Sequence, residues 1–286
     1  PFAGLFTQGM VCHETYKDEN NNWLSPDEIF SENGRDFFSI KNNKKVQVGP
    51  SESMSKSKKN TIDPEKIVLN YGADAVRLFI MSDSPPEKDI QWSTEGMEGS
   101  YKFIQKLWTL HKKFIEKINT NEKGNVDKEI TKYTNSLILK ITNNLENFRY
   151  NVIIANFYEM YNFFNKQLNN SISKEILIEC YYSILKLLNP FIPHFTSECF
   201  EEFSKFRKID NSWPEVNKEL LKNETVNLVI QVNGKKRDIL SVKKDINENE
   251  LLKMINSNEK VKNFIMNKKI MKKIFVPNKI INLIVK

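Results

Sequence analysis

The chain has 286 residues, and 43 Lys and Arg against 36 Asp and Glu give it a formal net charge of +7 and a pI near 9.0. This length allows one large domain or two to three small ones, and only 10 Pro and 9 Gly exclude a disordered chain and favour a helix-rich one. The positive charge suits a polyanionic partner, although a general richness in Lys, Asn and Ile would also produce it.

The three cysteines, Cys12, Cys180 and Cys199, stand far apart in the sequence. No pair has the spacing of metal ligands and their number is odd, so we expect reduced thiols in a cytoplasmic protein and no protein-bound metal. There is no signal peptide and no apolar run long enough to cross a bilayer, so we expect no membrane partner. The chain opens with Pro1 rather than Met, which suggests a fragment or one piece of a split enzyme.

Short strands are predicted for the first 50 residues. Leu5 to Val11 is an apolar, strand-like run that contains Gln8-Gly9-Met10-Val11. Residues 37–40 and 45–48 alternate in polarity and predict a small hairpin or ribbon.

A lysine-rich stretch, Ser53 to Asn60, follows this region, and we call it the signature loop. Gly49-Pro50 before it predicts a turn or loop, and Asp63 followed by Pro64 predicts a helix start with a carboxylate cap. A flexible ammonium on a mobile loop of this kind can follow phosphate charge as it develops in phosphoryl or nucleotidyl transfer. The alternative is a solvated basic surface loop.

Two helices are expected after the signature loop, one ending near Tyr71 and one across Ala73 to Met81, separated by Gly72. Asp74 and Arg77 lie three residues apart on one helix face, which predicts an ion pair between them. The other interpretation of these two residues is direct contact with RNA.

Helical periodicity continues from Glu95 to about Phe206 and predicts an antiparallel bundle of about five helices. Asn189-Pro190 breaks the pattern before the last of these helices. His194 begins that helix without a Ser, Cys or Asp partner in its sequence context, so we assign it a structural role rather than a catalytic one.

The last part of the chain predicts a small α/β domain. Residues 226–232 and 235–242 alternate as two strands around Asn233-Gly234, a strong signal for a two-residue hairpin. Two helices, at about 248–255 and 259–266, precede a closing strand pair at 270–276 and 280–285. The hairpin tip carries Lys235, Lys236 and Arg237, which suit phosphate contacts without base specificity; the alternative is a solvated turn.

Met54-Ser55-Lys56-Ser57 resembles the second signature of class I aminoacyl-tRNA synthetases, the KMSKS loop that holds the ATP phosphates during amino-acid activation. Gln8 to Val11, the segment from Asn189 to His194 and the stretch Val232 to Lys235 are similar to bacterial-type leucyl-tRNA synthetases. An isoleucine enzyme would typically end in a cysteine-ligated zinc module and a valine enzyme in a coiled coil, and neither pattern is present.

The resemblance implies a mainly α protein with small α/β parts and three regions. Residues 1–94 would be the C-terminal end of a Rossmann-type catalytic domain, 95–218 an anticodon-binding-type helical bundle, and 219–286 a tRNA-binding α/β domain. The residues implied are, for catalysis, Lys56, Ser55 and Ser57; for ATP binding, Met54, Ser55, Lys56, Ser57, Met10 and Gln8; and for tRNA binding, Lys235, Lys236, Arg237 and Arg149. For Met10 the alternative is a plain core strand.

The resemblance also implies the reaction and its partners. The family joins leucine to AMP from ATP, with Mg²⁺ accompanying the ATP, and then transfers leucine to tRNA(Leu) for protein biosynthesis. Ser53 stands where the family has its first lysine, and Lys58 and Lys59 could partly replace that charge.

Parts of the family pattern are missing from the sequence. The only histidines are His13, His111 and His194, so the His-x-Gly-His type motif is absent, as are the editing domain and most of the nucleotide-binding fold. We therefore expect the chain to need an N-terminal remainder, covalent or as a separate subunit, and to be inactive alone. The alternatives are a non-enzymatic tRNA-binding module and another class I synthetase, for isoleucine, valine or methionine.

Overall fold

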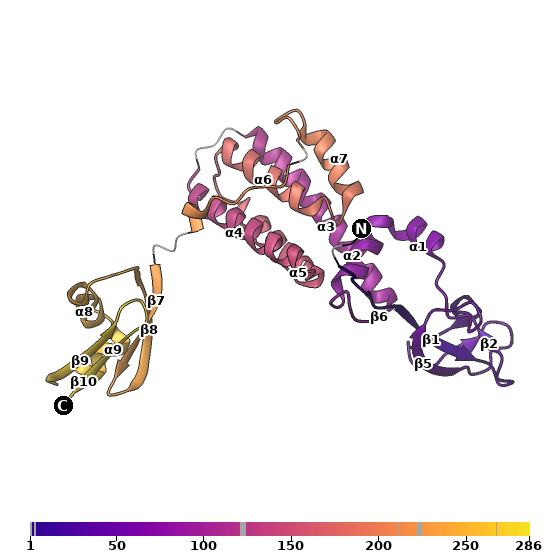
Figure 1. Cartoon of the computed structure of the whole chain (residues 1–286), viewed down its shortest axis with the longest axis horizontal. Helices are drawn as coiled ribbons and strands as arrows, with labels where there is room; N and C mark the ends of the chain where they lie inside the picture. The colour runs from indigo at the N-terminus through magenta and orange to yellow at the C-terminus, as the bar shows by residue number, and fades with distance from the viewer. Residues whose placement is uncertain (1, 3, 121–123, 211, 222–224, 267) are drawn as a thin grey trace. The chain divides into compact units, whose positions relative to one another are not determined.

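The computed structural model describes residues 2, 4–120, 124–210, 212–221, 225–266 and 268–286 (Figure 1). The chain divides into two compact units, Pro1–Leu220 and Leu221–Lys286. The mainly helical fold with small sheets confirms the fold class expected from the sequence. The finer division of the first unit at residue 94 stays a prediction.

The first unit begins with a small sheet built around β1 (Val11–Lys17). Its neighbours are β2 (Trp23–Leu24), β5 (Gln47–Ser53) and the parallel β6 (Ile90–Gln91). The prediction of a strand across Leu5 to Val11 is wrong, because the strand begins where that run ends. Before the strand, Gly9 packs against residues 86–88: its N–H donates to the carbonyl of Pro86 at 2.9 Å, and a Cβ there would lie 2.0 Å from the carbonyl oxygen of Lys88.

Gly49 and Pro50 lie inside β5, so the turn predicted for them is also wrong. β5 is at the edge of the sheet order β2-β1-β5, and its pairing with β1 is irregular between His13 and Thr15. A proline is tolerated at an edge or a bulge because it has no ladder hydrogen bond to donate there. The remaining short elements of this region are the 3₁₀ turn η1 (Pro26–Glu28) and the paired strands β3 (Ile29–Phe30) and β4 (Phe38–Ser39).

Two helices, α1 (Pro64–Tyr71) and α2 (Ala73–Ser82), connect the signature loop to the bundle. The cap prediction is confirmed, since the Asp63 carboxylate accepts the N–H of Glu65 at 3.0 Å. The five bundle helices are also confirmed, and they lie side by side in Figure 1. They are α3 (Thr94–Asn119), α4 (Asp127–Glu146), α5 (Tyr150–Gln167), α6 (Lys174–Leu188) and α7 (Pro193–Phe203).

The ion pair predicted within α2 is wrong, because both side chains reach the bundle. The carboxylate of Asp74 accepts the N–H of Phe195 at 2.7 Å and lies 3.0 Å from Nδ1 of His194. The guanidinium of Arg77 donates to the carbonyls of Pro190 and Phe191, at 2.6 and 2.9 Å. The carboxylate of Asp74 therefore caps the N-terminus of α7, which has no side-chain cap from its own N-cap residue. The free N–H groups at a helix N-terminus favour a negative charge there. The structural role predicted for His194 agrees with this contact.

Aromatic and aliphatic side chains fill the bundle core, which also encloses a polar group, His111 on α3. One ring nitrogen lies 2.5 Å from the hydroxyl of Tyr181, and the other lies 2.8 Å from a carboxylate oxygen of Glu202. Lys112 donates to the same carboxylate at 2.8 Å. Burial lowers the pKa of His111 below its ordinary 6.5, in spite of the opposing effect of Glu202. Hydrogen bonds from Lys112 and His111 lower the pKa of Glu202 from 4.5 to about 2.

We expect the bundle to lose stability as the pH falls. Below pH 6.5 the unfolded chain protonates its histidine while buried His111 stays neutral, so acid favours unfolding. A second loss follows between pH 4.5 and about 2, where unfolded Glu202 takes up a proton before the folded one. Urea unfolding followed by circular dichroism from pH 7.5 to 4.5 measures the first window. His111→Gln, which cannot titrate, should flatten this profile; an unchanged slope would assign the effect to other groups.

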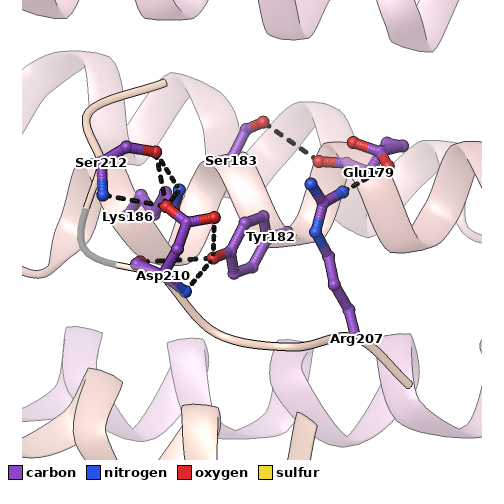
Figure 2. A network of polar contacts seen from close by, with 7 residues as sticks. All are labelled: Glu179, Tyr182, Ser183, Lys186, Arg207, Asp210 and Ser212. Carbon is purple, nitrogen blue, oxygen red and sulfur yellow. Dashed lines mark hydrogen bonds and ion pairs between the residues drawn. The ribbon is translucent and has the colours of Figure 1, made fainter. Parts of the chain in front are cut away.

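The segment that follows α7 is fastened to α6 by the network of polar contacts in Figure 2. The ammonium of Lys186 donates to Asp210 at 2.6 Å and to Ser212 at 3.0 Å. The Tyr182 hydroxyl accepts the N–H of Asp210 at 2.7 Å, and Arg207 pairs with a carboxylate on α6. Hydrogen bonds, first from Lys186 and then from Ser212, hold the pKa of Asp210 well below its usual range. These contacts fix the path of the chain where it leaves the bundle.

The second unit confirms the α/β domain predicted from alternation. Its elements are β7 (Thr225–Val232), β8 (Lys235–Lys243), α8 (Glu248–Asn256), α9 (Glu259–Ile265), β9 (Ile270–Val276) and β10 (Ile280–Val285), and the short turn η2 (Lys218–Leu221) precedes them. The strand order is β8-β7-β10-β9, with β10 parallel to β7. Asn233 and Gly234 both have positive φ, 50° and 76°, as a two-residue hairpin turn with matching twist requires. No helix among the described residues is long and apolar enough to span a membrane.

Candidate functional site

The signature loop leaves the end of β5 and turns back before α1. It stays close to the sheet, since the N–H of Met54 donates to the carbonyl of Val11 at 3.3 Å. A tight turn closes at its tip, where the N–H of Lys59 donates to the carbonyl of Lys56 at 3.3 Å and Lys59 has a φ of 56°. The loop is therefore held by specific hydrogen bonds at its start and at its tip.

The lysines of the loop differ in what surrounds them. Lys58 pairs with Glu52 on β5, and Lys59 pairs with Glu28 of η1 at 3.4 Å. Lys56 is exposed and, among the residues that the structure describes, its ammonium makes no ion pair. Lys58 and Lys59 would have to leave their carboxylates before they could replace the charge that is missing at Ser53. Lys56 is therefore the lysine of the loop whose ammonium could bind an anion without first breaking an ion pair to a described residue.

Two surface hollows flank the signature loop. One contains Lys56 together with Asp27, Asp63 and Lys66, and there Lys66 donates to Asp27 at 2.7 Å. The other is apolar and is lined by Val11, Met54, Ile62, Pro64, Ile67, Val76, Ile80 and Trp92. Met54 and Lys56 are two of the six residues that the sequence assigns to ATP binding, and they line adjoining hollows of different polarity.

The hydroxyls of Ser55 and Ser57 lie at the same loop, 3.3 Å apart. Ser55 also accepts the N–H of Lys58 at 3.3 Å, and Ser57 is exposed. Both hydroxyls are therefore placed beside Lys56, where they could donate to the same anion.

Gln8 and Met10 lie apart from the signature loop. Gln8 lines a separate hollow with Arg77, Tyr150 and Phe191, whereas the side chain of Met10 is exposed. The backbone of Met10 is fixed, since its N–H donates to Asp89 at 2.8 Å and its carbonyl accepts from β6. The structure does not bring these two side chains into one hollow with Lys56, and their part in ATP binding stays a prediction.

The basic residues predicted to bind tRNA have different surroundings. Arg149 is exposed at the N-terminus of α5, and Lys235 and Lys236 are exposed beside the β7–β8 turn. Arg237 instead turns back onto α9, with its guanidinium 3.7 Å from the ring centroid of Phe264. The ladder pairs Ile230 with Asp238 and then Gln231 with Lys236, so Arg237 is the extra residue of a bulge. Sequence spacing alone does not reveal such a bulge.

All three cysteines are buried free thiols, and burial raises the pKa of Cys180 to about 11 and that of Cys199 to about 12. Within the described part of the chain, no group of three or more His, Cys, Asp or Glu side chains is placed to hold a metal ion. Cys180 and Cys199 are therefore poor nucleophiles, since nucleophilic attack requires the thiolate.

Comparison of the sequence with known protein families identifies relatives of this chain. Residues 43–93 match the model of the class I tRNA synthetases for I, L, M and V, and residues 127–255 match the anticodon-binding domain of tRNA ligase. The chain is similar to the leucine–tRNA ligase of Rickettsia massiliae, with 40% identity over 287 residues that cover 100% of this chain and 34% of the relative. The leucine–tRNA ligase of Hyphomonas neptunium is 37% identical, with the same coverage of both chains.

A solved structure has a similar fold. It is the LeuRS of Agrobacterium radiobacter K84 in a ternary complex with tRNA and LeuAMS, and it matches 82% of this chain and 31% of its own with a TM-score of 0.66 and 24% identity. The chain spans about a third of the length of the curated relatives that it matches. The resemblance noted in the signature loop is confirmed along the whole sequence, and the chain belongs to the leucyl-tRNA synthetase family as a C-terminal portion of it.

Proposed function

We propose that the chain is the C-terminal part of a leucine–tRNA ligase, which activates leucine with ATP and transfers it to tRNA(Leu) when it is completed by the N-terminal part. The observation that carries this proposal is 40% identity to a leucine–tRNA ligase over the whole chain. The matching signature loop supports it, because its Lys56 is exposed and forms no ion pair within the described part of the chain. We place the reaction in cytoplasmic protein synthesis.

In activation, the leucine carboxylate attacks the α-phosphorus of ATP, leucyl-AMP forms and pyrophosphate leaves. The ammonium of Lys56 would follow and neutralise the negative charge on the phosphates in the transition state. The hydroxyls of Ser55 and Ser57 would donate hydrogen bonds to the same phosphate oxygens. Mg²⁺ would arrive with ATP and neutralise part of its charge; within the described residues no acidic cluster offers it a site of its own.

We assign the tRNA contacts to exposed cations in both units, namely Arg149, Lys235 and Lys236. Arg237 would stabilise the hairpin rather than contact the tRNA, because its guanidinium packs on the ring of Phe264. Phosphate contacts of this kind position an RNA without reading its sequence.

The double variant Lys235→Ala/Lys236→Ala should bind tRNA(Leu) more weakly and with a flatter salt dependence. Each lost phosphate contact removes roughly 0.7–0.9 from the slope of log K against log salt, so the pair should remove up to about 1.8. Filter binding between 50 and 200 mM KCl measures the slope. The matched control is Lys253→Ala/Lys260→Ala on α8 and α9, which removes the same charge from the same unit. Equal slopes for both double variants would make the hairpin tip a bystander.

A chimera tests the proposed function directly. In it, this chain replaces the 287-residue matching region of the Rickettsia massiliae ligase. We expect the chimera to charge tRNA(Leu) with leucine and not with isoleucine, valine or methionine. A folded chimera that binds tRNA but charges nothing would favour the tRNA-binding module, the alternative that Ser53 in place of a lysine suggests.

A further inference from the structure

Asn60, the last residue of the signature loop, is polar and fully buried. Both its carboxamide oxygen and its carboxamide nitrogen form hydrogen bonds. Its exposed fraction is 0%, whereas Lys59 before it and Thr61 after it are exposed. A buried carboxamide needs partners for its oxygen and for both N–H groups, since unpaired polar groups in the interior destabilise the fold. Among the residues that the structure describes, the partners of the Asn60 side chain are backbone groups.

The contacts of Asn60 join the two ends of the signature loop to the sheet. Its Oδ1 accepts the N–H of Ser55 at 2.8 Å, which closes the loop at its base. Its Nδ2 donates to the carbonyls of His13 and Glu52, both at 3.2 Å, and lies 3.4 Å from that of Ser53. His13 on β1 and Glu52 on β5 face each other in the ladder, so the carboxamide is anchored where the two strands pair.

This arrangement fixes the stretch that contains Lys56. With Ser55 and Asn60 bonded together, the residues between them form a closed turn, which the bond from Lys59 to the carbonyl of Lys56 tightens. The two ends of this short loop are already held together before a ligand binds. Binding therefore loses less conformational entropy than it would with an open loop. The backbone that carries the exposed side chain of Lys56 is therefore held in a defined position.

We propose that Asn60 is a positioning residue for the activation step: it touches no substrate and acts by fixing the turn that presents Lys56 to the phosphates. This inference rests on the proposed function for its effect on rate, and on the contacts above for its effect on the loop. An aspartate cannot substitute, because it donates no hydrogen bond and would place a negative charge against the carbonyls of His13 and Glu52. Alanine would remove the acceptor of the Ser55 N–H and the side-chain donor to those carbonyls.

A double-mutant cycle in the chimera tests the coupling to Lys56. Asn60→Ala and Asn60→Asp should each lower kcat of leucine-dependent ATP–pyrophosphate exchange about tenfold or more, with KM for ATP changed less, because Lys56 acts in the transition state. In a Lys56→Ala background, the same Asn60 variants should lower kcat less than about twofold, since residues that act through one another are not additive. The control is Asn70→Ala on the exposed side of α1, expected to be neutral in both backgrounds. Full additivity would overturn the proposal and leave Asn60 with a general stabilising role.

Hydrogen exchange in the 286-residue chain separates this inference from the proposed function, because it needs no activity. We expect the amide of Ser55 to exchange at least about tenfold faster in Asn60→Ala, while the amides of α1 and of the bundle keep their protection. Asn60→Asp can still accept from Ser55, so it should retain part of that protection. If the wild-type chimera is inactive but Ser55 responds in this way, the proposed function fails and the loop contact stands. Unchanged exchange at Ser55 would overturn the positioning role whatever the activity.

Discussion

Lys56→Ala in the chimera is expected to lower leucine-dependent ATP–pyrophosphate exchange by roughly 10²–10³-fold, which corresponds to about 2.7–4 kcal/mol of transition-state stabilisation. The physical reason is that Lys56 is exposed and makes no ion pair with any residue that the structure describes, whereas Lys58 and Lys59 pair with Glu52 and Glu28. No loop lysine is placed to take over its role without first breaking an ion pair. Steady-state exchange at saturating leucine, with ATP varied, gives kcat and KM separately.

Lys45→Ala is the matched control, since Lys45 is an exposed lysine near the signature loop that pairs with Asp36 at 2.7 Å. It should change exchange less than about twofold, as a surface ion pair contributes little. The affinity of Lys56→Ala for tRNA(Leu) should stay nearly that of the parent. A loss of tRNA affinity comparable to the loss of exchange would show that the assigned role of Lys56 is wrong.

His111→Ala is expected to lower the free energy of unfolding of the bundle by about 3 kcal/mol. The substitution removes one hydrogen-bond partner from the buried Tyr181 hydroxyl and one from Glu202. It also opens a cavity beside Trp108, whose ring lies 5.2 Å from the imidazole. Urea unfolding at pH 7.5, followed by circular dichroism of the helices, measures the difference.

His194→Ala is the control for this experiment. Its imidazole also meets a carboxylate, Asp74 at 3.0 Å, but the side chain is 75% exposed. We expect a loss below about 1 kcal/mol there, because water replaces the lost contact and the carboxylate still caps α7 through the backbone. Similar losses for both histidines would mean that burial of the His111 network contributes little.

The elements that the sequence predicts best are those specified by local pattern. Strict alternation around Asn233-Gly234 defines β7 and β8, and periodic Phe and Leu residues define the bundle helices. The signature loop was identified because its four central residues match a family motif, and the comparisons confirm that family. Asp63 before Pro64 predicted a cap that the structure contains.

The parts that the sequence did not reveal depend on contacts between distant segments. Asp74 meets residues 120 and 121 positions away, so helical spacing wrongly favoured a local partner. Gly49-Pro50 has the composition of a turn, but its place at a sheet edge makes it a strand. Asn60 belongs to the stretch that resembles the family signature, but its burial between β1 and β5 and its hydrogen bonds to them are seen only in the structure.

Leucine-dependent ATP–pyrophosphate exchange by two separate proteins tests the central claim most directly. One is this chain, and the other is the part of the Rickettsia massiliae ligase outside the matching region, with their association checked by gel filtration. We predict exchange in the mixture and none with either protein alone, and we predict that it requires leucine. An associated mixture that binds tRNA(Leu) yet shows no exchange would contradict the assignment of this chain to a working leucine–tRNA ligase.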